Sequence, residues 1–339
     1  MTQGKKRSPV IDRVRGAALL LVMLGHTMSV CTTGSERSFL YQIIWSLQMP
    51  LFFLISGYVT RFSREISDWS ILVRQLGRRS LQLLLPFAVW TFLVRGLLFG
   101  QTYFLNVGWL IRHMDSGYWF LFSLWTISVV YLFSAFLSGK LLKRKRLVGT
   151  TVLFGLLLAL LALLAFWQGK DLLGLKLTLY YSAFYLLGAL TGALIEKLAL
   201  PKKALFVGTL VCIGIWLALL TKFDFYSSAD DLFHIALRAV SSLLGCASVF
   251  GFAAACRHWK GERLPRRGLQ WVGTHTLELY LVHYLCLNLI RQDPAPACVS
   301  FNGAGLTILN FFLTLLISVI VTEILSRFSI PRLVLYGKK

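Results

Sequence analysis

The chain has 339 residues, of which 57% are hydrophobic and 14% are charged, and its formal net charge is +21. An ordinary soluble domain carries roughly 25% charged residues, so this composition excludes a soluble globular protein, a disordered chain and a small disulfide-stabilised scaffold. The 35 basic residues fall in short clusters between long apolar runs, which is typical of a polytopic membrane protein and argues against a nucleic-acid-binding protein.

Ten apolar runs have about the length of a membrane-spanning helix, which needs roughly 20 residues. They are 14–31, 39–60, 81–99, 118–138, 147–167, 177–195, 204–221, 233–254, 271–290 and 305–326. The first run continues through His26 with no small-residue cleavage site, so we expect a retained helix and not a signal peptide. The sequence predicts an all-α, polytopic transmembrane helical bundle of about ten spans. We expect one integral-membrane domain over residues 1–339, with short basic tails at 1–13 and 327–339.

The loops that join these runs alternate in charge. The two tails and the loops after the second, fourth, sixth and eighth runs hold 26 Lys and Arg residues, whereas the other loops hold 6. Cytoplasmic loops of membrane proteins carry an excess of basic residues. We therefore expect both termini to lie in the cytoplasm.

The six cysteines lie mostly in apolar runs and show no Cys-x-x-Cys spacing. Buried free thiols are the favoured interpretation, and a disulfide between Cys31 and Cys298 across external loops is the alternative. His and carboxylate residues do not show the spacing of a metal site, so no metal is expected.

Ionisable residues inside the apolar runs are the best candidates for function, because they are costly in lipid and by default face the bundle interior. Arg15 and His26 are eleven residues apart, so an α-helix places both on one face, about 16 Å apart along its axis. One interpretation is an arginine at the membrane rim and a packing histidine. The other is an anion anchor at the mouth of a tunnel and a proton acceptor at its end.

Five short motifs support the second interpretation. The first is Asp12-x-x-Arg15-Gly16 followed by Gly25-His26. The others are MPLFFLISGY at 49–58, Arg74-x-x-x-Arg78-Arg79 followed by Pro86, WFL at 119–121 and LYLVH at 279–283. Together, and in this order, they resemble the acyltransferase family 3 integral-membrane enzymes. Gly117 departs from the pattern, since many members of that family have a histidine there, and the fused esterase-like domain of some relatives is lacking.

The resemblance implies transfer of an acyl group, in the first place acetyl, from cytoplasmic acetyl-CoA or another acyl-CoA. The implied acceptor is a hydroxyl of a cell-surface carbohydrate (capsule, exopolysaccharide, lipopolysaccharide or another envelope glycan) or of its lipid-linked precursor. The implied location is the bacterial cytoplasmic (inner) membrane, with lipid as the surrounding partner. A secondary transporter or flippase for an envelope-glycan intermediate is the alternative, although no paired repeat supports it.

The resemblance also implies roles for individual residues. His26 would be the general base and Arg15 would act with it, while Arg74, Arg78 and Arg79 would hold the phosphates of coenzyme A. For these three arginines, plain positive-inside topology is the alternative. Residues expected to line the substrate cavity are Asp12, Ser56, Trp119, His283 and Glu278. For Ser56 the alternative is a small residue that permits close helix packing. Trp119 is either an interfacial belt residue or a sugar-stacking platform.

Overall fold

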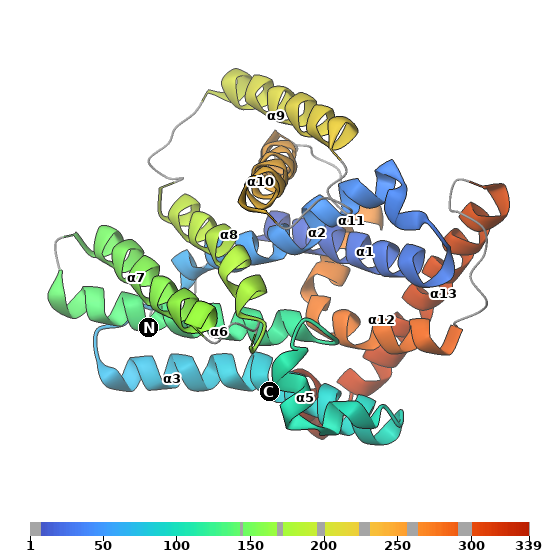
Figure 1. Ribbon diagram of the computed structural model, residues 1–339, viewed down its shortest axis with the longest axis horizontal. Helices are drawn as coiled ribbons and strands as arrows, with labels where there is room; N and C mark the ends of the chain where they lie inside the picture. The colour runs from blue at the N-terminus through green and yellow to red at the C-terminus, as the bar shows by residue number, and fades with distance from the viewer. Residues whose placement is uncertain are drawn as a thin grey trace. The chain divides into compact units, whose positions relative to one another are not determined.

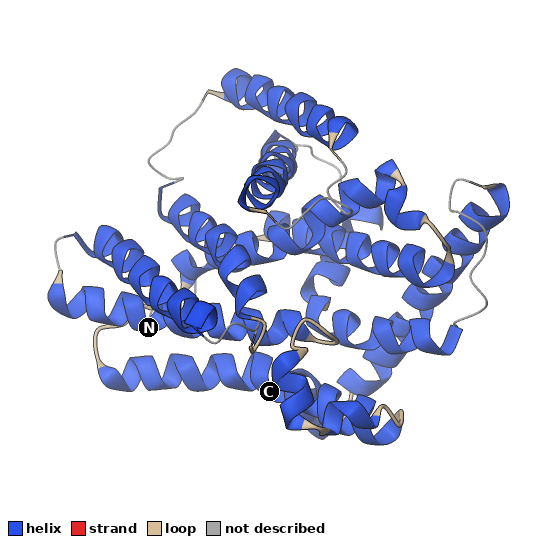
Figure 2. Cartoon of the chain, in the orientation of Figure 1, coloured by secondary structure: helices blue, strands red, loops and turns tan. Residues whose placement is uncertain are grey.

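The computed structural model describes residues 8–142, 145–167, 172–194, 201–223, 231–255, 264–290 and 300–338. Within these ranges all regular elements are helical and none is a strand, which confirms the predicted all-α class (Figure 2). In chain order the α-helices in Figure 1 are α1 (Pro9–Cys31), α2 (Phe39–Tyr58), α3 (Trp69–Arg79), α4 (Leu85–Ala88), α5 (Val107–Arg112), α6 (Trp119–Leu141), α7 (Arg146–Trp167), α8 (Leu175–Leu194), α9 (Lys202–Lys222), α10 (Leu232–Ala255), α11 (Leu264–Thr274), α12 (Thr276–Ile290), α13 (Phe301–Ser326) and α14 (Ser329–Tyr336).

Eight helical segments among the described residues are long and apolar enough to cross a membrane, and they coincide with eight of the ten predicted runs. They are Pro9–Cys31, Phe39–Phe62, Trp69–Leu98, Trp119–Leu141, Arg146–Leu164, Lys203–Lys222, Leu232–Ala253 and Phe301–Ser326. The run 177–195 coincides with the 20-residue helix α8, whose first turns carry Lys176, Thr178 and two tyrosines that lower its hydropathy. The chain is therefore an integral membrane protein.

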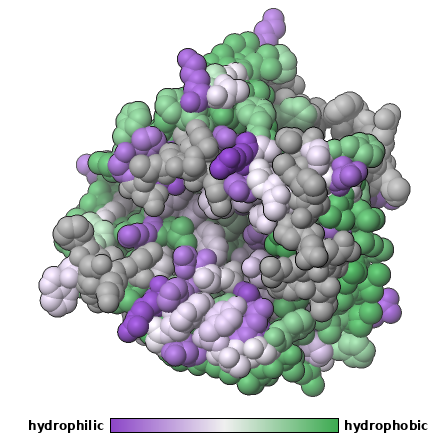
Figure 3. Space-filling view, turned by 45° about the vertical axis from the view of Figure 1, so that its right-hand side comes forward, coloured by the Kyte–Doolittle hydropathy of each residue, from purple (hydrophilic) through white to green (hydrophobic). Residues whose placement is uncertain are grey.

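The surface of α13 is arranged as lipid exposure requires. Its buried positions recur every three or four residues and are small or polar: Gly303, Thr307, Asn310, Thr314, Ser318 and Thr322. Its large apolar residues, such as Phe312 and Leu316, are exposed. Apolar side chains likewise cover large parts of the surface in Figure 3. A helix with lipid on one side and a polar bundle interior on the other shows this inverted pattern.

The predicted run 271–290 is not one helix, because the chain breaks between α11 and α12. The hydroxyl of Thr274 donates to the carbonyl of Trp271 at 2.8 Å, and that of Thr276 donates to the carbonyl of Gly273 at 3.2 Å. The His275 ring stacks on the Trp271 indole with the ring centroids 4.3 Å apart. These side chains satisfy the last carbonyls of α11 and so end the helix.

The basic stretch between the predicted runs 39–60 and 81–99 is predicted to be a loop. Much of it is helical instead, because α3 covers Trp69–Arg79. The carboxylate of Asp68 accepts a hydrogen bond from the Ile71 N–H at 2.9 Å and caps α3. This bond is the main cause that lowers the pKa of Asp68, and bonds from Ser70 and Ser67 add to it. From α3 the chain stays helical to Leu98 through two π-helical stretches, η3 (Ser80–Leu84) and η4 (Val89–Leu98).

The chain divides into two compact units. The first comprises Met1–Tyr58 and Leu190–Glu323, and the second comprises Val59–Ala189 and Ile324–Lys339. The predicted tail 327–339 is not a free tail, because α14 packs within the second unit. There the Trp90 indole donates to the carbonyl of Leu335 at 2.8 Å and stacks on the buried Tyr336.

Contacts within the second unit show which loops share a side. Glu65 and Arg146 form an ion pair, and Arg146 also donates to the carbonyl of Ile66 at 3.2 Å, so the loops after α2 and α6 lie together. At the other end of the same spans, the N–H of Leu173 donates to the carbonyl of Ile111 at 2.7 Å. This alternation matches the grouping of loops by charge, while the cytoplasmic location of the basic side stays a prediction.

Accessibility of single cysteines tests that location. In a variant that lacks the native cysteines, Glu65→Cys should react with a membrane-impermeant thiol reagent only after the cells are permeabilised. Asp115→Cys, on the loop at the other end, should react in intact cells. Both positions are exposed, so labelling from the opposite sides would show that the predicted orientation is inverted.

Candidate active site

Two glycines bring α1 and α11 into direct backbone contact in the first unit. A Cβ atom added to Gly16 would overlap the carbonyl oxygen of Leu269, and one added to Gly273 would overlap that of Asp12. Small residues allow such close approach of helices in a membrane. His26 follows Gly16 by ten residues on α1, and His283 follows Gly273 by ten residues on α12. The glycine contact therefore holds α1, which carries His26, against α11, and α12 with His283 begins two residues after α11 ends.

The two histidines contact each other. Nδ1 of His26 lies 2.9 Å from Nε2 of His283, and the two rings are parallel to within 4°. The ring of Tyr284 meets His26 edge-on, with the centroids 5.6 Å apart. His283 is only 1% exposed, whereas His26 is partly accessible. Of this pair, His26 is the more exposed residue.

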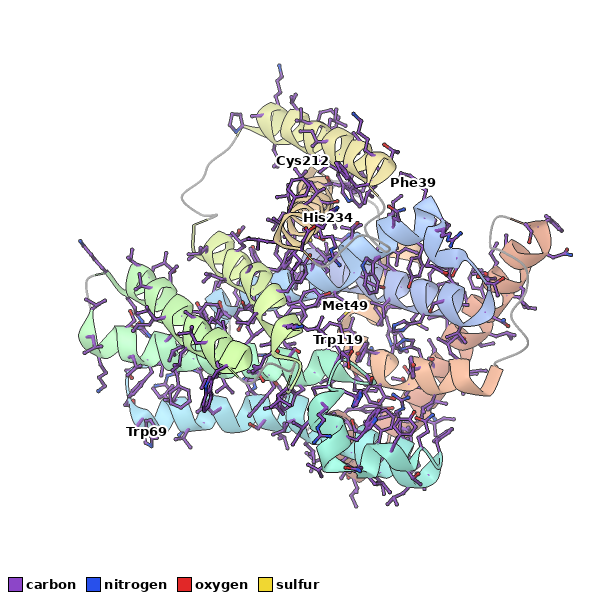
Figure 4. The ribbon with its side chains drawn as sticks, in the orientation of Figure 1. Phe39, Met49, Trp69, Trp119, Cys212 and His234 are labelled. Carbon is purple, nitrogen blue, oxygen red and sulfur yellow. The ribbon has the colours of Figure 1, made fainter. Side chains whose placement is uncertain are left out.

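Gln48 is a buried polar residue beside α1 that the sequence analysis did not single out. It lies on α2, and its Oε1 is 3.2 Å from the point that a Cβ on Gly25, the residue before His26, would occupy. The side chain is 5% exposed, and its Oε1 has no hydrogen-bond partner among the described residues. The available signal was an amide in an otherwise apolar run, directly before Met49 (labelled in Figure 4) and Pro50.

The first unit holds six of the predicted site residues. Helix α1 is continuous from Pro9 to Cys31, so Arg15 and His26 have the helical spacing on which the prediction depends. Arg15 is half-buried, and Asp12 is 2% exposed with its backbone against Gly273. Ser56 is half-buried in the last turn of α2, and Glu278 is buried in the first turn of α12. Of these six residues, His26 and His283 contact each other through their rings.

The second unit holds the other four. Arg74 and Arg78 are exposed on α3, one helical turn apart, and Arg79 is half-buried beside them. Trp119 begins α6 (Figure 4), and its indole stacks on Tyr181 with the centroids 5.4 Å apart. The three arginines thus form one basic cluster on a helix end, and Trp119 belongs to an aromatic pair.

Arg95 explains why position 117 is glycine. The buried guanidinium donates from Nε to Oε1 of Gln101 at 2.8 Å and lies 4.3 Å from the centre of the Phe104 ring. A Cβ on Gly117 would come within 2.8 Å of Nη1 of Arg95, and Gly117 has a φ of +69° that favours glycine. The side chain of Arg95 therefore occupies the space that a histidine at 117 would need.

The described residues include four of the six cysteines as well as His, Asp and Glu side chains, the possible metal ligands. Cys31, Cys212, Cys246 and Cys286 are free thiols, while Cys256 and Cys298 lie outside the described ranges, so the Cys31–Cys298 alternative stays untested. In the same ranges no group of three or more His, Cys, Asp and Glu side chains is placed to hold a metal ion.

Comparison with known proteins adds a family match. A family model described as an acyltransferase domain matches residues 9–327 and so runs through both units. The chain is similar to nodulation protein NolL of Sinorhizobium fredii (strain NBRC 101917 / NGR234). The two are 28% identical over 298 residues, which cover 81% of this chain and 77% of that protein. No solved structure matches the chain.

Proposed function

Because the chain belongs to the acyltransferase family whose domain model it matches, we propose that it is a membrane O-acetyltransferase that uses acetyl-CoA or another acyl-CoA from the cytoplasm. The acceptor is a hydroxyl of a cell-surface carbohydrate or of its lipid-linked precursor, and the location is the bacterial cytoplasmic (inner) membrane. One observation carries the proposal: an accessible imidazole, His26, is held by a second imidazole inside a membrane-embedded helix bundle.

His26 is the general base in this proposal. An imidazole takes and returns a proton near neutral pH, which suits transfer to a hydroxyl. His26 removes the proton of the acceptor hydroxyl as the oxygen attacks the thioester carbonyl carbon. The carbon–sulfur bond then breaks, and the same proton passes from His26 to the departing sulfur. The products are the O-acyl ester and free coenzyme A, so the histidine is regenerated.

The arginines hold the acyl donor. Coenzyme A carries several phosphate charges, and the planar guanidinium group bonds phosphate oxygens through two parallel N–H groups. Arg74 and Arg78 are neighbours on one face of α3, and Arg79 follows directly. Arg15 and Asp12 lie toward the basic end of α1, away from His26. Trp119 is the proposed stacking platform for the sugar. Ser56 and Glu278 are the polar groups of the first unit that we propose to face the substrate.

Acyl-CoA turnover distinguishes this function from transport. The purified protein should release free coenzyme A from acetyl-CoA in the presence of acceptor, and the release should depend on His26. The surface glycans of cells with the gene should carry an acetyl-sized mass increment that is absent without it. A transporter or flippase would move the glycan without either change, so the absence of both signals would refute the proposal.

Replacing Arg78 and Arg79 together by alanine should raise KM for acetyl-CoA about tenfold or more and leave kcat nearly unchanged. The estimate follows from charge-assisted hydrogen bonds worth about 1.5–3 kcal/mol, made to phosphates far from the reacting carbonyl. The double variant Arg61→Ala/Arg64→Ala removes the same charge from the neighbouring loop and is the control. Equal effects of the two double variants would indicate that these arginines serve topology alone.

A further inference from the structure

We propose that His283 is a positioning residue that holds His26 in the tautomer whose Nε2 is free to accept a proton. This inference rests on the proposed function, since it assigns how the base of that reaction is prepared. It depends on a chain of three groups in the first unit: the carbonyl of Leu279, the ring of His283 and the ring of His26.

The first link decides where the hydrogen of His283 lies. Nδ1 of His283 is 3.1 Å from the carbonyl oxygen of Leu279, one turn earlier on α12. A carbonyl oxygen can only accept a hydrogen bond, so this Nδ1 carries the hydrogen and donates it. A neutral imidazole has one N–H, and Nε2 of His283 is then an acceptor.

The second hydrogen bond determines which nitrogen of His26 carries the hydrogen. Nε2 of His283 faces Nδ1 of His26 at 2.9 Å, and since Nε2 accepts, Nδ1 of His26 must donate. A doubly protonated His283 would reverse the direction, but a charged ring is costly at membrane depth, and His283 is 1% exposed. Neither ring has a carboxylate among its hydrogen-bond partners in the described residues. Both rings are therefore neutral in the resting site.

These two hydrogen bonds leave Nε2 of His26 as the nitrogen that can accept a proton. With the hydrogen of His26 on Nδ1, the lone pair is on Nε2, which has no hydrogen-bond partner among the described residues. When Nε2 takes the hydroxyl proton, the N–H on Nδ1 stays bonded to His283, which steadies the imidazolium and keeps the ring in place. A base oriented by a second group in this way is a recurring catalytic arrangement. Without His283, His26 would sample both tautomers and lose its fixed orientation.

Two substitutions of nearly equal size isolate the acceptor at position 283. His283→Gln places an amide oxygen near the position of Nε2, where it can accept from Nδ1 of His26. His283→Met fills similar space without such an acceptor. We expect kcat within about tenfold of wild type for His283→Gln and a loss of about 10²–10⁴-fold for His283→Met. KM for acetyl-CoA should be unchanged in both, because the proposed role of His283 is to orient His26 and not to bind the phosphates of the donor.

The thermal stability of each purified variant is measured in detergent alongside kcat and KM, so that a structural role can be separated from a positioning role. Equal loss in both variants, or full activity in His283→Met, would overturn the positioning role. A purely structural role would lower stability and activity together in the Met variant. The proposed function fails separately: in that case wild type would not turn over acetyl-CoA, or His26→Ala would remain active. An inactive His26→Ala with a fully active His283→Met would refute the positioning role alone.

Discussion

Alanine at position 26 is expected to lower the kcat for acyl transfer by about 10²–10⁴-fold, the usual contribution of a general base. His26 is the partly exposed member of the histidine pair and the proposed base, so alanine removes the group to which we assign the acceptor proton. Only one partly accessible side chain of a many-helix bundle changes, and the amount of protein inserted in the membrane should stay the same. Release of coenzyme A by purified wild type and variant measures the effect.

His113→Ala is the control for this experiment. His113 is also accessible and also stacks on a neighbour, with its ring centroid 4.5 Å from that of Trp109, but it lies in the second unit and has no proposed role. It should retain most of the wild-type activity. If His26→Ala also retains wild-type kcat, His26 is a packing residue and the acyl-transfer mechanism proposed for it is wrong.

The second large effect is expected at Gly273, where even a methyl group has no room. A Cβ at this position overlaps the carbonyl oxygen of Asp12, which belongs to the backbone of α1 and cannot rotate away. Gly273→Ala must push α1 from α11, and we expect a loss of about 3 kcal/mol or more of stability together with loss of activity. Thermal unfolding of the purified protein and release of coenzyme A provide the two readouts.

Gly268→Ala is a matched control on the same helix. An added Cβ at Gly268 meets no atom within 4 Å, so the same substitution there costs no overlap. Alanine favours helix over glycine by about 1 kcal/mol, and the Gly268 variant should be as stable as wild type or slightly more stable. Equal stability of the Gly273 and Gly268 variants would show that the close approach of α1 to α11 does not matter.

The helices could be predicted because each span must present a long apolar run to lipid. The same rule failed where polar side chains bond the backbone locally: Thr274, His275 and Thr276 end α11 inside an apolar run. It failed again at α3, where arginines that suggest a loop lie on a capped helix. Hydropathy reports the surroundings of a segment, and it does not report how the carbonyls of a helix end are satisfied.

The site was predicted in part. The spacing of Arg15 and His26 placed both on one helix, and the motif order drew attention to His283, but neither argument brings His26 and His283 into contact. They are separated by 257 positions, and their contact depends on the packing of α1 against α12, which the sequence pattern does not report. The burial of Gln48 beside Gly25 and the packing of Arg95 against Gly117 were not predicted for the same reason. Such contacts join separate segments of the chain and leave no periodic signal in the sequence.

The contact between Gly16 and α11 also has a consequence for how the protein is made. Leu269 is synthesised about 250 residues after Gly16, which takes on the order of ten to fifty seconds of translation. During that time α1 is in the membrane with Asp12, Arg15 and His26 but without the helix that covers it. The helix that carries His26 is therefore among the first parts to be inserted and among the last to reach its final surroundings. A ribosome that stalls before α11 would leave α1 without its contacts to that helix, and such a fragment is an expected target of membrane proteases.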